Sequence, residues 1–261
     1  MVIEWDVTLP ALTGKRPRKA YIYLPDCYDQ DDIRRYPVLY MFDGQNVFFD
    51  GNASFGKSWG MNAYMTWTRK PLIIVGVECN TRGNGRLREY TPVSFSDEKY
   101  GDITGQGKKY MNWLVNELKP YIDENYRTLP DREHTYICGS SMGGLMALYA
   151  VAHYNAWFSK GACVSSAIGF CMRPLMKDLR QSAISPDTRI YLSWGTREAW
   201  GIKNPNREDR SSKTWGWNKR VADYAMTTGA AVKLHCQVGG GHCEADWEQL
   251  VPTFMNFLWR E

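Results

Sequence analysis

Apolar residues follow two different periods along this chain. Short runs rich in β-branched and aromatic residues predict strands, and they lie at residues 19–24, 36–42, 72–77, 135–138, 161–164, 189–194 and 231–238. The run at 72–77, LIIVGV, is apolar on both faces, which is typical of a central strand with helices on both sides of the sheet.

Between these runs, apolar residues recur at every third or fourth position, which is the period of a helix with one buried face. This pattern predicts helices over residues 109–125, 143–154, 215–228 and 245–258. Pro120 lies inside the apolar stripe of the first helix and predicts a kink or an end there. Alternating strands and helices favour an α/β fold with a mostly parallel sheet, helices on both faces and right-handed crossovers.

Three segments fit neither period: residues 93–107, 170–187 and 199–214. We interpret them as long loops on the rim of a functional site, because long irregular segments in compact domains are usually functional. A length of 261 residues suits one large open α/β unit, so residues 1–261 are predicted to form a single domain.

Charge and cysteine content exclude several classes of protein. A net charge of +4 is too small to indicate a nucleic-acid partner. The Gly-rich segment 82–86 lacks the spacing of a phosphate-binding P-loop, so we interpret this segment as a surface turn. Seven scattered cysteines without C-x-x-C spacing favour reduced thiols in a cytoplasmic protein, with no metal site and no cofactor. The first 24 residues are unlike a signal peptide, and the longest apolar stretch, 71–77, is too short to span a membrane.

The segment 137–145, ICGSSMGGL, contains the motif G-x-S-x-G with Ser141 at its centre. A predicted strand precedes the motif and a predicted helix follows it, which is the context that a nucleophilic serine requires. The serine then occupies a tight turn, and Gly139 and Gly143 remove the Cβ atoms that would clash. The alternative is a Gly/Ser-rich turn used only for close packing.

A serine hydroxyl needs a neighbouring base, and the chain has only four histidines. His134 stands at the start of the strand before Ser141, His153 on the helix after it, and His235 inside the last strand. His242 instead follows three glycines at the carboxyl end of that strand, where catalytic groups gather in open parallel sheets. Elimination therefore predicts His242 as the base.

The acid that orients the base is expected between the serine and the histidine in the chain. Glu198 follows the strand 189–194 at its carboxyl end, where it could accept the second imidazole N–H. Asp187 precedes that strand and lies at the wrong end. Glu208 and Asp209, in the following loop, remain as alternatives to Glu198.

Two further groups of residues complete the predicted site. Backbone N–H groups of Met142 and Gln45 are expected to form the oxyanion hole, Gln45 because it lies in the DGQN loop after the strand 36–42. An ordinary tight turn would give the same loop sequence.

The chain also holds 11 Trp and 16 Tyr. Those near the predicted rim are candidates for a substrate-binding wall, with core packing as the alternative; they are Trp200, Trp215 and Trp217.

These segments resemble the esterase D-like branch of the α/β-hydrolases, which includes enterochelin-esterase-like, feruloyl and acetylxylan esterases. The matching strings cover most of the chain from Lys19 onward: RRYPVLYMFDGQNVF, LREYTP, NELKPYIDENYRT, GSSMGGLMALY, GTRE and GGGHCEADW. The resemblance implies an α/β-hydrolase fold and a triad of Ser141, Glu198 and His242. One departure is Asp43-Gly44, where lipase-type relatives carry a His-Gly pair.

The sequence therefore predicts a serine carboxylic-ester hydrolase. Its expected substrate is a small-molecule or carbohydrate-linked ester with an acetyl, feruloyl or similar acyl group. A siderophore-lactone esterase and an acyltransferase on the same fold are the alternatives among enzymes. A non-catalytic binding module is the alternative from another class.

Overall fold

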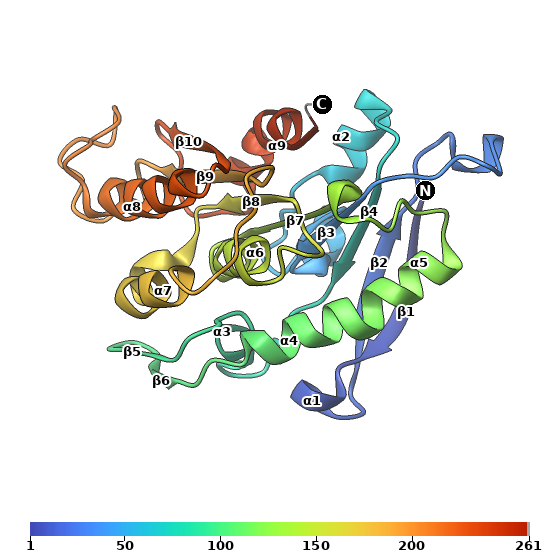
Figure 1. Ribbon diagram of the computed structural model, residues 1–261, viewed down its shortest axis with the longest axis horizontal. Helices are drawn as coiled ribbons and strands as arrows, with labels where there is room; N and C mark the ends of the chain where they lie inside the picture. The colour runs from blue at the N-terminus through green and yellow to red at the C-terminus, as the bar shows by residue number, and fades with distance from the viewer. Residues whose placement is uncertain (260–261) are drawn as a thin grey trace.

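The computed structural model describes residues 1–259, and its centre is one eight-stranded sheet (Figure 1). The strand order is β1-β2-β4-β3-β7-β8-β9-β10. The bounds are β1 Val2–Thr8, β2 Pro17–Tyr23, β3 Val38–Phe42, β4 Ile73–Val77, β7 Thr135–Ser140, β8 Lys160–Val164, β9 Arg189–Gly195 and β10 Ala231–Gln237. The pairs from β4 to β10 are all parallel, whereas β2 is antiparallel to both of its neighbours. The predicted mostly parallel sheet is confirmed.

The edge strand β1 was not among the predicted strands. Its residues alternate strictly, with Ile3, Trp5 and Val7 packed against the core and Glu4 and Asp6 exposed. Charged residues are depleted in strands and weaken the local signal. The antiparallel partner β2 lets this face bury its apolar residues, and only the tertiary structure supplies that partner.

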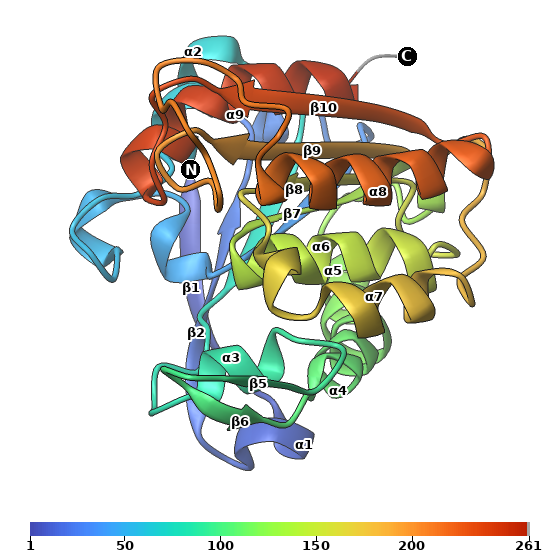
Figure 2. The ribbon, with the colours of Figure 1, turned by 90° about the vertical axis from the view of Figure 1, so that its left-hand side faces the viewer.

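Helices cover both faces of the sheet (Figures 1 and 2). One face carries α2 Met61–Thr68 and α9 Glu244–Trp259. The other face carries α4 Gly107–Trp113, α5 Lys119–Asn125, α6 Met142–His153, α7 Met172–Leu179 and α8 Lys213–Thr227. Two short helices, α1 Pro10–Thr13 and α3 Gly85–Glu89, complete the set. Each face buries its own apolar cluster, which holds the sheet rigid between the two helical layers.

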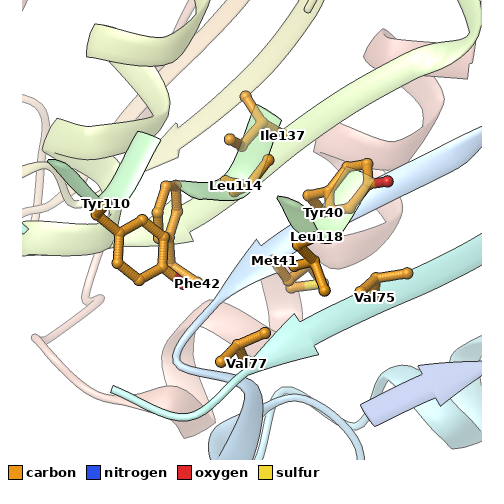
Figure 3. Close-up of a pocket in the computed structure, with 9 residues that line it drawn as sticks. All are labelled: Tyr40, Met41, Phe42, Val75, Val77, Tyr110, Leu114, Leu118 and Ile137. Atoms are coloured by element: carbon orange, nitrogen blue, oxygen red, sulfur yellow. The ribbon is translucent and has the colours of Figure 1, made fainter. Parts of the chain in front are cut away.

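The expected kink at Pro120 is replaced by a wider turn before it. Residues Leu114–Leu118 form a π-helical turn in which Lys119 N donates to Leu114 O, and the helix then continues to Asn125. A π turn accommodates a proline, which has no N–H to give to the regular ladder. Its side chains and those of three strands enclose a small, mainly apolar cavity (Figure 3). This cavity contains no nucleophile or base and belongs to the core.

Two of the three predicted loops contain regular structure. The segment 93–107 holds a hairpin of β5 Phe95–Asp97 and β6 Gly101–Ile103, and the segment 170–187 holds α7. These elements are too short for periodicity to reveal them. The third loop ends at residue 212, because the Ser212 hydroxyl accepts a hydrogen bond from Trp215 N and caps α8 two residues earlier than predicted.

The state of the cysteines and the length of the helices relate to the predicted reduced thiols and to the predicted absence of a membrane span. All seven thiols are free, and four of them are buried. Within residues 1–259, none of the helices combines the length and the hydropathy needed to span a lipid bilayer.

Candidate active site

Ser141 occupies the sharp turn between β7 and α6. Its φ of 57° and ψ of −120° lie outside the regions that L-residues normally adopt. A Cβ on Gly139 would lie 2.6 Å from the backbone of Gly143, and one on Gly144 would lie 2.8 Å from Val164 O. Close backbone contact therefore requires these glycines, and the turn lifts the Ser141 side chain out of the sheet.

Strained residues mark the same edge of the sheet at two neighbouring strands. Asp43 follows β3 with φ 58°, and Ser165 follows β8 with φ 44°. Together with Ser141 they account for three of the four non-glycine residues at positive φ within residues 1–259. Such strain persists only where the surrounding structure enforces it, and it clusters at functional sites.

His242 and Glu198 meet at this edge. His242 Nδ1 is hydrogen-bonded to Glu198 Oε2. The other carboxylate oxygen, Oε1, accepts hydrogen bonds from Gly195 N at 2.7 Å and from Ser165 Oγ at 2.6 Å. Both carboxylate oxygens are therefore occupied, and the Glu198 side chain is only 11% exposed.

Trp247 supports this arrangement from α9. Its Nε1 donates to Ser165 Oγ at 2.9 Å, and its ring stands edge-on to the His242 ring with centroids 5.0 Å apart. One buried side chain thus contacts both the base and the residue that holds the acid.

A cavity of about 500 Å³ opens between these side chains and brings the predicted triad together. Ser141, His242 and Glu198 all line it, as does Met142. Within residues 1–259 the Ser141 hydroxyl makes no hydrogen bond of its own, so it can turn toward the imidazole or a substrate. The aromatic lining consists of Phe55, Tyr100, Phe170, Trp194, Trp200 and Trp217.

The other three histidines are engaged elsewhere. His134 Nδ1 contacts the Asp131 carboxylate at 2.7 Å, and His153 contacts Asp178 at 2.6 Å. His235 is half-buried on β10 with Nδ1 2.6 Å from the Tyr191 hydroxyl, and burial lowers its pKa. None of the three lines the cavity.

The predicted oxyanion donors stand at the starts of two helical turns. Met142 is the first residue of α6 and Gln45 lies in the 3-10 turn Gly44–Asn46, and the first N–H groups of such turns lack intrahelical partners. The Gln45 side chain is held away from the cavity by hydrogen bonds to Ser54 and Cys79. Met142 is among the cavity-lining residues and Gln45 is not.

An ion pair between the partly exposed Arg86 and the buried Asp43 fixes the loop that carries Gln45. Arg86 donates from Nε and Nη2 to the two carboxylate oxygens of Asp43, each at 2.7 Å. Burial opposes the charge of Arg86, but the adjacent Asp43 outweighs it and raises the pKa of the guanidinium. Asp43 therefore fills the place of the lipase-type histidine with a charge that Arg86 neutralises.

The same loop is joined to the histidine loop by a second contact. Asn46 Nδ2 donates to Glu244 Oε1 at 2.9 Å, across 198 positions of the chain. Glu244 begins α9 two residues after His242, and burial raises the pKa of its carboxyl. This contact links the carboxyl ends of β3 and β10.

Trp215 lies outside the cavity, unlike the other two predicted tryptophans. Together with Glu208 and Arg210 it lines a separate hollow between α8 and β10. Residues 215 and 217 are two positions apart on a helix, about 200° around its axis, so they face opposite ways. The predicted aromatic wall is therefore reduced to Trp200 and Trp217.

Several residues of the site were not predicted. Arg86 belongs to the segment read as a surface turn, yet it lines the cavity beside its ion-pair partner. Ser165 directly follows a predicted strand at its carboxyl end, so its position alone could have marked it. Trp247 and Glu244 fall inside the GGGHCEADW string, where only His242 was assigned.

Comparisons with known proteins identify the family and the fold. The family model described as "Putative esterase" matches residues 12–258. "Uncharacterized protein YbbA" of Bacillus subtilis (strain 168) is 28% identical over 185 residues, which cover 69% of each chain. The enterobactin esterase FES from Shigella flexneri, solved in the presence of enterobactin, has a TM-score of 0.72 at 18% identity, over 99% of this chain and 58% of that one. A ferulic acid esterase has a TM-score of 0.65 at 18% identity, over 99% of this chain and 97% of that one. The structural likenesses show the α/β-hydrolase fold.

Proposed function

The chain belongs to the esterase family whose model it matches and is a serine esterase, and from that premise we propose that Ser141, His242 and Glu198 form its catalytic triad. The observation that carries this proposal is their convergence on one cavity, with Ser141 on a strained turn and His242 hydrogen-bonded to Glu198. The alternative acids Glu208 and Asp209 lie outside the lining of that cavity.

The proposed reaction proceeds in two steps. Ser141 Oγ attacks the ester carbonyl while His242 Nε2 accepts its proton, and the tetrahedral intermediate collapses when the alcohol leaves with that proton. Water then attacks the acyl-serine while His242 Nε2 accepts a proton from it. The bond from the acyl carbon to Ser141 Oγ breaks, His242 returns the proton to Ser141, and the carboxylic acid is released. Glu198 keeps the imidazole proton on Nδ1, so that Nε2 presents its lone pair.

Backbone N–H groups of Met142 and Gln45 are proposed to stabilise the oxyanion. Met142 begins α6 after β7, and Gln45 lies in the first helical turn after the adjacent strand β3, so both N–H groups belong to helical N-termini at the carboxyl edge of the sheet. The ion pair between Asp43 and Arg86 supports this loop, because two charge-assisted hydrogen bonds fix its backbone next to Ser141.

The cavity favours an uncharged ester with an aromatic or other flat apolar group. Six aromatic side chains line it, and aromatic rings bind flat apolar groups by stacked or edge-to-face contact. Among the cavity-lining residues within residues 1–259, Arg86 alone carries a positive side chain. Its charge is neutralised by the carboxylate of Asp43. A strongly anionic acyl group would therefore gain little there, which favours a feruloyl-like ester over an anionic siderophore lactone.

Two activated esters with the same leaving group test this proposal. 4-Nitrophenyl 3-phenylpropionate is expected to have a kcat/KM at least about 10-fold above that of 4-nitrophenyl acetate, since burying a phenyl ring is worth about 1.5–3 kcal/mol. Equal or reversed values would contradict the aromatic preference.

Labelling tests the nucleophile separately. A fluorophosphonate probe is expected to modify Ser141, and Ser141→Ala is expected to lower kcat on the order of 10⁶-fold without loss of fold. Ser140→Ala serves as the matched control, because Ser140 is the adjacent buried serine at the end of β7. Modification of another residue, or activity that survives Ser141→Ala, would refute the assigned triad.

A further inference from the structure

Ser165 lies directly after β8, and its hydroxyl is held between two partners. Its Oγ accepts a hydrogen bond from Trp247 Nε1 at 2.9 Å and donates one to Glu198 Oε1 at 2.6 Å. An indole N–H can only donate, so the single hydroxyl proton of Ser165 is left to point at the carboxylate. The direction of this hydrogen-bonded chain is fixed by the chemistry of its members.

We propose that Ser165 is the positioning residue for Glu198, and that Trp247 acts through Ser165 by fixing the direction of its hydroxyl. This inference rests on the proposed function, because it assigns both roles relative to the triad. In this scheme neither residue attacks the substrate or exchanges a proton with it.

The arrangement determines which carboxylate oxygen meets the base. Oε1 of Glu198 already accepts two hydrogen bonds, from Gly195 N and from Ser165 Oγ. Oε2 is therefore the oxygen available to His242 Nδ1, and the carboxylate plane is held by two donors on adjacent strand ends. An ionised acid fixed in this way keeps the imidazole tautomer that leaves Nε2 unprotonated.

The backbone of Ser165 supports a role for its side chain. Its φ of 44° is one that glycine adopts without strain and serine rarely adopts. A glycine here would be the less strained choice, but it would supply no hydroxyl. The hydrogen bonds of the side chain are therefore made at the cost of backbone strain.

The strained backbone at Ser165 allows the loss of the hydroxyl to be separated from the loss of stability. Ser165→Ala removes the hydroxyl, and Ser165→Gly removes it while relieving the strain, so the glycine variant is expected to be more stable than the alanine variant. In both variants kcat for 4-nitrophenyl 3-phenylpropionate is expected to fall about 10- to 100-fold, the range for losing a hydrogen bond to a charged group, with KM within about twofold. If the serine were merely structural, kcat would recover in the more stable glycine variant; an equal loss of kcat in both variants assigns the effect to the missing hydroxyl.

Ser193→Ala is the matched control. Ser193 is a buried serine on the neighbouring strand β9, its Oγ has no hydrogen-bond partner within residues 1–259, and it does not line the cavity. Its kcat and KM are expected to stay within about twofold of the wild type.

A double-mutant cycle tests the part assigned to Trp247. Trp247→Phe removes the N–H and keeps a ring beside His242, so kcat is expected to fall about 3- to 10-fold, less than in Ser165→Ala. In the Ser165→Ala background the same change is expected to cost less than about twofold, because its route to Glu198 is already lost. Two independent, multiplicative losses would overturn the claim that Trp247 acts through Ser165.

The outcomes separate this inference from the proposed function. A wild type that neither reacts with the fluorophosphonate nor hydrolyses either ester refutes the proposed function itself. An active wild type with Ser165→Ala and Ser165→Gly both within twofold of it refutes only the role of Ser165. Proton NMR gives a readout independent of turnover: the far-downfield His242 Nδ1–H resonance expected in the wild type should shift or broaden in both Ser165 variants, and an unchanged resonance would overturn the inference.

Discussion

The strand ends of the site and the rim above them are built differently. Ser141 and Ser165 follow their strands directly, with strained backbones, and hydrogen bonds among buried or largely buried groups tie Ser165 to the acid and to α9. On the rim, Phe55 and Trp200 come from irregular loops and are 84% and 56% exposed. The side chains at the strand ends are held in one arrangement by their hydrogen bonds, whereas the rim side chains expose apolar area to solvent.

This contrast separates chemistry from selectivity. Proton transfer requires atoms at hydrogen-bond distance in one tautomer, which only a rigid frame supplies. Recognition of an acyl group needs apolar area, which a loop can supply with many arrangements. We therefore expect changes at the strand ends to lower kcat and changes on the rim to raise KM.

The largest effect is expected from Glu198→Gln. Because Gly195 N and Ser165 Oγ both donate to the first side-chain oxygen, the amide oxygen of the new side chain should take that position and its NH₂ group should face His242 Nδ1. The imidazole would then carry its proton on Nε2 and could not accept one from Ser141. The expected loss in kcat is about 10⁴-fold with little change in KM, measured by steady-state kinetics.

Glu208→Gln is the matched control for that change. Glu208 was an alternative acid from the sequence and lies beside Trp215 and Arg210, away from the cavity. Its kcat is expected to stay within about twofold of the wild type. A large loss in Glu208→Gln, with a small one in Glu198→Gln, would reverse the assignment of the acid.

An intermediate effect is expected on the rim from Trp200→Ala. The Trp200 ring contacts Phe170 and Trp217, with centroids 6.2 Å and 5.8 Å apart. Its loss should raise KM for 4-nitrophenyl 3-phenylpropionate about 10-fold, and change kcat/KM for the acetate less than about twofold.

Trp215→Ala controls for the loss of an indole near α8, since Trp215 faces the opposite side of that helix. It is expected to leave KM for both esters unchanged. If Trp215→Ala raised KM as much as Trp200→Ala, or if Trp200→Ala lowered kcat instead, the division between strand ends and rim would fail.

The same division describes what the sequence could predict. The strand ends follow local rules: G-x-S-x-G constrains the backbone around Ser141, and position after a strand selects Glu198 and His242. The rim depends on helix phase. The predicted helix 215–228 already contained both Trp215 and Trp217, so helix phase alone would have placed these two side chains on opposite faces.

Pairs of distant side chains could not be predicted at all. Asp43 and Arg86 are 43 positions apart, and Asn46 and Glu244 are 198 apart. No local pattern encodes such partners, because the sheet order brings their segments together. Polar residues beside a motif can therefore be noticed from sequence, but their partners come from the fold.

The smallest effect is expected at the contact between the two strand ends, and it depends on pH. Burial raises the pKa of Glu244, as does nearby Asp43, and this outweighs the start of α9, which favours the charged form. A raised folded-state pKa gives stability that is fully present below the unfolded pKa of about 4.3 and is lost as pH rises through the folded value. Glu244→Gln keeps an oxygen for Asn46 and removes the buried charge.

The Tm of Glu244→Gln should therefore equal that of the wild type near pH 4 and exceed it by about 2–4 °C at pH 7–8, a shift that about 1 kcal/mol produces in a domain of this size. Glu248→Gln removes a charge from the same helix at a position where the side chain is 40% exposed and paired with Lys57. It should show no gain that grows with pH, because an exposed carboxylate loses little hydration on folding. A Tm difference for Glu244→Gln that is constant with pH would mean that the contact with Asn46, and not the buried charge, sets the stability of this junction.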